Sequence, residues 1–177
     1  MLQVTINMEE QLVSKSFPDN KGNHLLVALY FYGRRYKEEV LNIPSEYSAT
    51  EIADISIEKA DMDRGLAYTA FVAMNQWLLE RVREHPNAVF TFICSTDPFE
   101  NNSGEEIKDG AEAQDYRWRL FNRLYDRVSA IHKDLKLNIQ DIVVGPEGYE
   151  SHARAFYPDI HQPIIHIITA NLTEKYT

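Results

Sequence analysis

Arginines stand out in the stretch DYRWRLFNRLYDRV, residues 115–128, because four of them stand among large apolar residues. A guanidinium group binds a phosphate or a carboxylate through two parallel hydrogen bonds. The N-terminus of a helix adds free N–H groups and a positive dipole end, so this stretch has the chemistry of an anion site. On a helical wheel, Arg117 lies at the centre of the apolar face. Arg119, Arg123 and Arg127 form a stripe along its side.

Three roles are open to Arg117. An arginine that faces a core needs a partner, because an unpaired buried charge is very costly. The structural interpretation pairs it with an acidic residue of the preceding loop or of the strand end at 95–97. The functional interpretation is a small anionic ligand, held by Arg117 and Arg119 with Asn122 or Arg123 in support. In the third interpretation the side chain extends back to water.

The stripe of Arg119, Arg123 and Arg127 is typical of a solvated helix face. Asp115 precedes Arg119 by four residues, a spacing that favours an ion pair. The stretch 96–113 is predicted to be a long polar loop, and such loops are usually functional or disordered. Residues 97–115 carry seven acidic side chains and one lysine, or −6 of the net charge of −9. Part of this loop is therefore suited to fold back onto the arginine helix.

Cys94 would be a nucleophile if a general base lay beside it, and a histidine from the C-terminal region is the candidate base. That hypothesis predicts selective alkylation of the thiol near neutral pH. The favoured interpretation is a small buried hydrophobic residue. No metal site or cofactor is predicted. The six histidines form no His-x-x-x-His pair, the acidic loop lacks EF-hand spacing, and the chain has no Cys-x-x-Cys, P-loop or Gly-x-Ser-x-Gly motif.

The segments TFICSTD (91–97) and RWRLFNR (117–123) together resemble the core of a family of small uncharacterised bacterial proteins, known only as a domain of unknown function. In that family a strand ends in Cys-Asp or Cys-Ser. A polar turn follows, and then a helix that reads Arg-x-Arg-Leu-Phe-Asp/Asn-Arg. The resemblance implies a strand–helix–strand–helix–strand context and singles out Arg117, Arg119 and Arg123. It implies no activity, and this chain departs from the pattern by its much longer acidic loop.

Composition indicates one soluble globular domain over residues 1–177, since 44% of the residues are hydrophobic and 25% are charged. The net charge of −9 disfavours nucleic acid as a partner. Aromatic residues in ALYFYGRRY (28–36) are faintly like a single-strand-binding sheet, but alternating aromatics in a strand are more often core. No apolar run approaches the roughly 20 residues that span a membrane. The N-terminus lacks a secretory signal, so we expect a cytoplasmic protein.

Hydrophobic periodicity predicts the elements that position these residues. Strands are expected over 2–7, 24–33, 52–59, 88–95, 138–145 and 162–171, with 34–43 as an edge strand. Turn residues fill 16–24, and 146–161 is expected to be irregular or to form a short helical turn. Helices are expected over 63–85, with Asp61 or Asp63 as N-cap and Pro86 as stop, and from 111 or 114 to 133.

This order favours a single α+β domain with a mostly antiparallel sheet and two long helices packed on one face. A strand–helix–strand step would add a parallel pair through a right-handed crossover. The leading functional hypothesis is a non-enzymatic protein that acts through protein contacts, as a homodimer or as an accessory factor of another protein. It rests on the missing catalytic motifs, the exposed polar strands and the long acidic loop. Binding of a small anion by the arginine helix is the alternative.

Overall fold

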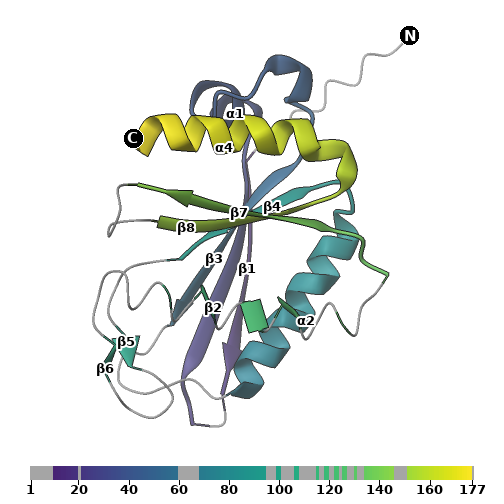
Figure 1. The fold of residues 1–177 in the computed structure, drawn as a ribbon. Coiled ribbons are helices and arrows are strands. Elements are labelled where there is room, and N and C mark those ends of the chain that lie inside the picture. Colours follow the sequence, from purple (N-terminus) through teal and green to yellow (C-terminus); the bar gives the residue numbers. More distant parts are fainter. Residues whose placement is uncertain are drawn as a thin grey trace.

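Six strands form one strongly twisted sheet (Figure 1) in the order β1-β2-β3-β4-β8-β7. The computed structural model describes residues 10–19, 21–59, 68–94, 99–100, 106–107, 134–145 and 151–176, together with residues 115, 118, 119, 122, 123, 125, 126 and 130. The sheet consists of β1 (Gln11–Pro18), β2 (His24–Phe31), β3 (Ile52–Lys59), β4 (Val89–Ile93), β7 (Asn138–Val144) and β8 (Ser151–Tyr157). The helices are α1 (Arg34–Glu39), α2 (Tyr68–Glu84) and α4 (Gln162–Tyr176), with short 3-10 turns η1 (Ser45–Tyr47) and η2 (Asp159–His161).

The sheet is mixed but mostly antiparallel, as predicted, because four of its five strand pairs among the described residues are antiparallel and one is parallel, and the α+β class is confirmed. Strands β1, β2 and β3 pair antiparallel in succession, and β8 pairs antiparallel with both β4 and β7. Strands β3 and β4 run parallel. Helix α2 makes the connection between them, as expected for a strand–helix–strand step.

One face of the sheet packs against α2. Alternate β2 residues from Leu25 to Phe31 are buried with Phe71, Met74 and Trp77 of the helix. Phe71 and Met74 belong to the apolar face that predicted this helix, and Trp77 widens it. Trp118 and Tyr125 pack against the same cluster, and both lie in helical backbone. Most of the predicted second helix lies outside the described residues, so two helices on this face remain a prediction.

Helix α4 covers the opposite face, over β7 and β8, in place of a predicted last strand. Ile164, Ile165 and Ile168 are buried there against Val89 and Ala155. Their β-branched side chains favour a strand locally. The spacing i, i+1, i+4 nevertheless places all three on one helical face, and burial of that face decides the structure. The strand prediction for 162–171 was therefore wrong.

Residues 34–43 were also predicted wrongly, as an edge strand. Helix α1 forms instead, and ion pairs at i, i+4 spacing join Arg34 to Glu38 at 2.8 Å and Arg35 to Glu39 at 2.9 Å. Such pairs favour a helix modestly. Lys37 contributes more to the stability of α1, because its side chain is fully buried.

Of the other predicted strands and helices, most are confirmed, some segments differ, and some lie outside the described residues. The strands over 24–33, 52–59, 88–95 and 138–145 and the helix over 63–85 are confirmed within the described residues, and β4 is central as expected. Strand β8 lies in the stretch that was predicted to be irregular, and β1 covers a segment that was given no strand. Strands β5 (Phe99–Glu100) and β6 (Glu106–Ile107) pair within the predicted acidic loop. The predicted strand over 2–7 and the caps Asp61 and Asp63 lie outside the described residues.

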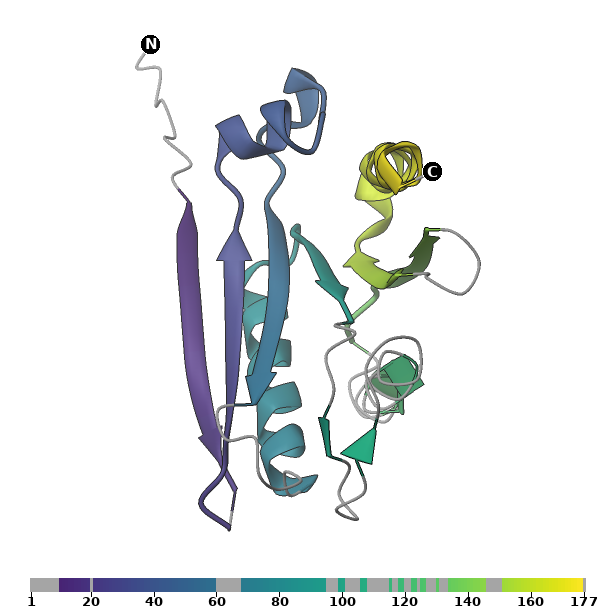
Figure 2. The ribbon, with the colours of Figure 1, turned by 90° about the vertical axis from the view of Figure 1, so that its left-hand side faces the viewer.

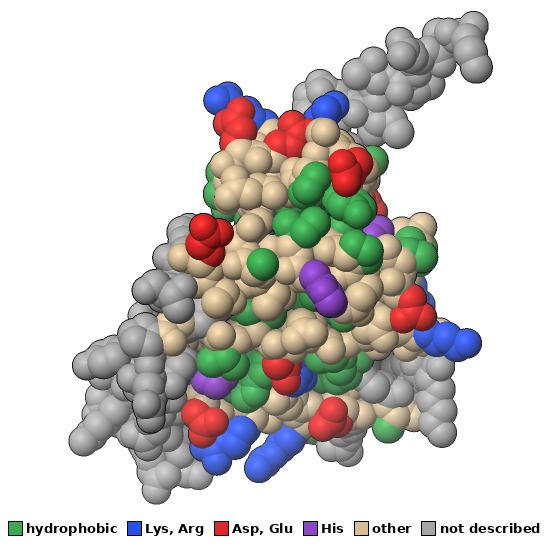
Figure 3. Space-filling model, turned by 45° about the horizontal axis from the view of Figure 1, so that its top comes forward, with side chains coloured by type: hydrophobic (Ala, Val, Ile, Leu, Met, Phe, Trp, Pro, Cys, Tyr) green, Lys and Arg blue, Asp and Glu red, His purple; other side chains and the backbone are tan. Residues whose placement is uncertain are grey.

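Two apolar residues are exposed near the ends of these helices. Val40 directly follows α1, and Ile160 belongs to η2. Figure 3 views the end of the molecule that carries α1 and α4, where hydrophobic side chains gather and Lys and Arg lie at the margins of the view. Among the described residues, no helix is long and apolar enough to cross a membrane.

Candidate functional site

The predicted arginine site is only partly within the described residues, and Arg117 lies outside them. Arg119 pairs with Asp115 at 2.9 Å, and both side chains are exposed. Arg123 is exposed as well. The amide Oδ1 of Asn122 is buried and has no hydrogen-bond partner among the described atoms. Arg119 thus forms the ion pair that its spacing predicts, and anion binding by the arginines remains a prediction.

A different arginine is buried and paired. Arg154 of β8 is 8% exposed and binds Asp141 of β7, with Nε–Oδ1 and Nη2–Oδ2 distances of 2.6 and 3.0 Å. Its guanidinium carbon lies 4.6 Å from the ring centre of Trp118. Asp141 and Arg154 are opposed in the strand register, thirteen residues apart in the chain. Sequence reasoning missed this pair because it had not predicted β8.

Cys94 is buried, as expected, with 4% of its surface exposed. Its N–H donates to the carbonyl of His152 at 3.0 Å, so Cys94, directly after β4, lies beside His152 of β8. The His152 ring lies 5.5 Å from Trp118. The structure thus brings the cysteine beside a C-terminal histidine but buries it in the hydrophobic core, which favours its structural role. No group of three or more His, Cys, Asp or Glu among the described residues is placed to hold a metal ion.

An apolar cavity of about 90 Å³ lies between the sheet and α2. Its walls include Ile55 and Ile57 of β3, Leu78 of α2, Phe90 of β4 and Tyr125. Most of the lining side chains are half-buried, so the space is an apolar pocket at the edge of the core that suits an apolar group.

A buried polar cluster closes one end of the sheet. Lys37 is 0% exposed, and its Nζ donates to the carbonyls of Ser48 at 2.5 Å and Thr50 at 2.8 Å. Burial lowers the pKa of this amine, and the neighbouring Glu51 carboxylate offsets part of that effect. Lys37 therefore anchors the chain between η1 and β3 to helix α1.

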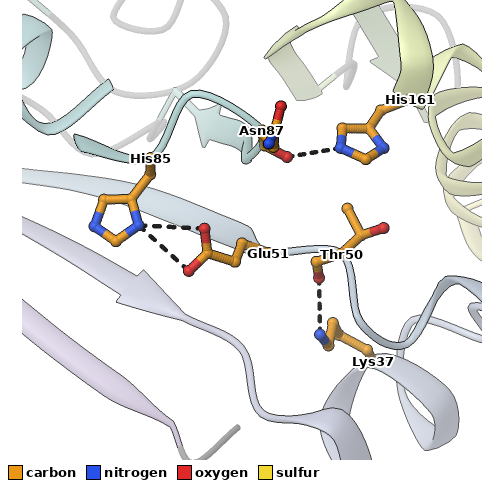
Figure 4. A network of polar contacts seen from close by, with 6 residues as sticks. All are labelled: Lys37, Thr50, Glu51, His85, Asn87 and His161. Carbon is orange, nitrogen blue, oxygen red and sulfur yellow. Dashed lines mark hydrogen bonds and ion pairs between the residues drawn. The ribbon is translucent and has the colours of Figure 1, made fainter. Parts of the chain in front are cut away.

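Two histidines extend this cluster to other elements, as Figure 4 shows. His85, at the end of α2, lies 3.3 Å from the carboxylate of Glu51 and packs on the ring of Phe31. His161 of η2 has Nε2 at 2.6 Å from the carbonyl of Asn87. All of these groups join the ends of neighbouring elements, so the cluster is a structural junction.

The other face of β1 to β4 is open to solvent except at the end near α4, where Ile52 and Val89 are buried, and we call the open part the open sheet face. Figure 2 looks onto it, with α2 behind the strands. It is defined by the residues that alternate with the buried ones: Leu12, Ser14, Ser16, His24, Leu26, Ala28, Tyr30, Tyr32, Asp54, Ser56, Glu58, Thr91 and Ile93. All of them are exposed or half-buried. The set contains two carboxylates and no lysine or arginine.

Tyrosines and a carboxylate meet at the centre of the open sheet face. Tyr30 of β2 is opposite Asp54 of β3, and Asp54 is opposite Thr91 of β4. The Thr91 hydroxyl donates to Asp54 Oδ1 at 3.0 Å. Tyr32 lies 5.2 Å from Tyr30 at an interplanar angle of 75°, and stacks on Tyr36 of α1 at 4.5 Å and 10°. Of the aromatics of 28–36 that were expected in the core, Phe31 is buried, Tyr32 packs against the cluster under α4, and Tyr30 is half-buried on this face.

The surroundings of this group shift its ionisation. Burial raises the pKa of Asp54, although hydrogen bonds from Thr91 and from the Ile55 backbone lower it in part. Burial also raises the pKa of Tyr32, and the charge of Asp54 adds to the effect. A hydrogen bond with Glu10 raises the pKa of Tyr30. Sequence alternation in IADISIEK indicated a polar side of β3, but nothing in the sequence placed it beside tyrosines.

Because its pKa is raised in the folded protein, Asp54 should make the free energy of unfolding depend on pH. The folded state binds the proton more tightly than the unfolded state, so stability is lost as pH rises from the ordinary pKa through the raised one. Asp54→Asn has no such loss. Its free energy of unfolding should therefore increase relative to the wild type across this window, measured by urea unfolding between about pH 3 and pH 7. A difference that stays constant with pH would contradict the expectation. Thr91→Val, which removes a hydrogen bond that lowers the pKa, should widen the window.

Comparison with known proteins adds no relative to this picture. No family model, no curated protein and no solved structure matches the chain. The resemblance carried by residues 91–97 and 117–123 therefore stays a prediction. Among the described residues, the open sheet face gathers exposed apolar side chains, tyrosines and carboxylates on one side of the sheet.

Proposed function

We propose that this chain is a non-enzymatic interaction domain, and that its open sheet face binds an apolar and basic segment of a partner protein. The observation that carries the proposal is exposed apolar surface on this face. Leu12 is 64%, Leu26 37% and Ile93 60% exposed, beside half-buried tyrosines. Leu12 is the cross-strand neighbour of Tyr30, and tyrosine is enriched at protein interfaces.

Charge on the open sheet face selects the kind of partner. Asp54 and Glu58 lie on it, Glu10 contacts Tyr30 at its border, and no lysine or arginine lies among its residues. Two copies of the chain docked face to face would bring these carboxylates together, which is unfavourable. A basic partner segment complements them, so a different protein is favoured over a homodimer.

Binding of a small anion by Arg117, Arg119 and Arg123 is less well supported as a function. Asp115 already neutralises Arg119, and the ion pair would have to break before Arg119 could bind an anion. Our proposal keeps the expectation of a cytoplasmic bacterial protein and assigns its activity to protein contacts.

Selection from a library of random displayed peptides tests the proposed function. Peptides that bind the full chain should perturb backbone NMR signals of Leu12, Leu26 and Ile93. The double variant Leu12→Asp with Ile93→Asp should bind them at least about tenfold more weakly, because charge is placed in the apolar contact. Val143→Asp is the matched control, since Val143 is 52% exposed but lies on β7, outside the open sheet face. Binding that maps elsewhere, or that is weakened equally by the control, would overturn the proposal.

A further inference from the structure

Asp54 is a half-buried carboxylate that forms no ion pair with a described lysine or arginine. Arg154 and Lys37 are satisfied by a carboxylate and by two carbonyls, respectively. Asp54 accepts hydrogen bonds from Thr91 and from the backbone of Ile55. None of the ion pairs among the described residues includes it. A desolvated carboxylate without a cation is unfavourable, so an external cation would gain from meeting it.

Aromatic rings stand directly beside this carboxylate. Tyr30 is the cross-strand neighbour of Asp54, and neighbours of this kind have Cβ atoms about 5 Å apart. Tyr32 meets Tyr30 edge-on and is held by its stack on Tyr36. The rings are therefore fixed before any ligand arrives. Tyrosine faces attract cations through their quadrupole, and the attraction grows when the site is desolvated.

We infer that Asp54, Tyr30 and Tyr32 form a recognition site for an arginine side chain of the partner segment. This inference rests on the proposed function and names the anchor of that interaction. Arginine fits better than lysine, because its planar guanidinium stacks on an aromatic ring while donating two parallel hydrogen bonds to a carboxylate. Thr91 holds one carboxylate oxygen in place at 3.0 Å and acts as the positioning residue.

A structural role for Asp54 makes a different prediction from a recognition role. If the carboxylate served only to bond Thr91, Asp54→Asn would keep that bond through its amide oxygen and would change no binding property. If the carboxylate recognises arginine, the same variant keeps its fold and loses the preference for a cation. The substitution therefore separates the two roles.

The experiment uses a fluorescent peptide, Ile-Thr-Val-Arg-Val-Thr-Leu, and two twins that carry citrulline or lysine in place of arginine. Citrulline keeps the shape of arginine but not its charge. The wild-type chain should bind the arginine peptide about tenfold more tightly than the citrulline peptide, with lysine in between. Asp54→Asn should bind the arginine and citrulline peptides equally. Glu46→Gln is the matched control, because it removes an exposed carboxylate of η1, outside the open sheet face, and should keep the preference.

NMR signals at millimolar peptide separate the ways of failing. If the peptides shift Leu12 and Ile93 but bind equally with arginine and citrulline, the arginine site is overturned and the proposed function stands. A preference that persists in Asp54→Asn overturns the arginine site as well. If none of the peptides shifts any residue of the open sheet face, and the displayed library also yields no binder to it, both proposals are overturned.

Discussion

Replacing Lys37 by alanine is expected to lower the free energy of unfolding by about 4 kcal/mol, as measured by urea unfolding. Two effects add. The carbonyls of Ser48 and Thr50 lose their donor, and each unsatisfied buried acceptor costs about 1–3 kcal/mol. The aliphatic stem of a side chain that is 0% exposed also disappears, leaving a cavity. The lowered pKa of the amine shows that burial disfavours its charged form, and this cost opposes the stabilisation by the two hydrogen bonds.

Lys37→Met separates the two effects. Methionine restores most of the buried stem without the donor, so it should recover about half of the loss. Arg35→Ala is the matched control on the same helix, because the Arg35 side chain is 87% exposed and its ion pair with Glu39 is solvated. That change should cost less than about 1 kcal/mol. A methionine variant as stable as the wild type would show that the two hydrogen bonds contribute nothing net.

Phe90→Ala should cost about 4 kcal/mol of unfolding free energy, within the range for buried phenylalanine. Phe90 is 1% exposed on the central strand β4, opposite Phe156 of β8, and its ring meets that of Phe31 at 6.5 Å. It also lines the cavity of about 90 Å³. Truncation would therefore enlarge an existing void, and the rigid sheet on one side limits how far the core can collapse into it.

Two variants on the same strand calibrate this loss. Phe90→Leu keeps most of the apolar volume and should cost about 1–2 kcal/mol. Ile93→Ala changes a side chain that is 60% exposed, so it should change stability by less than about 0.5 kcal/mol. Chemical denaturation at one pH gives all three values. A loss below about 2 kcal/mol for Phe90→Ala would mean that the cavity already lets the surrounding side chains rearrange.

Strong local patterns determined what the sequence could predict. Helix α2 follows from apolar residues at helical spacing. Strands β2 and β4 follow from short runs of apolar residues that favour strands. The ion pair of Arg119 with Asp115 follows from i, i+4 spacing alone. Burial of Cys94 follows from its place at the end of an apolar strand. Each of these rests on neighbours close in the chain.

Local patterns failed where two structures suited the same residues. The isoleucines of α4 favour a strand by propensity, and their burial against β7 and β8 decides for a helix. Helix α1 is six residues long, too short to be stable alone, and depends on the buried Lys37. Strand β8, with its alternating alanines, has little apolar signal of its own and gains its structure from β4 and β7 on both sides.

The candidate sites depend on register, which the sequence does not contain. Tyr30, Asp54 and Thr91 lie in three strands separated by long connections, and only pairing of these strands aligns them. The same holds for Arg154 and Asp141. By itself the sequence determined an acidic α+β chain, most of the inner strands and helix α2, because periodicity within a segment selects its buried face. The tertiary structure alone decided which polar side chains meet, because contacts between distant segments depend on how strands pair and which face a helix covers.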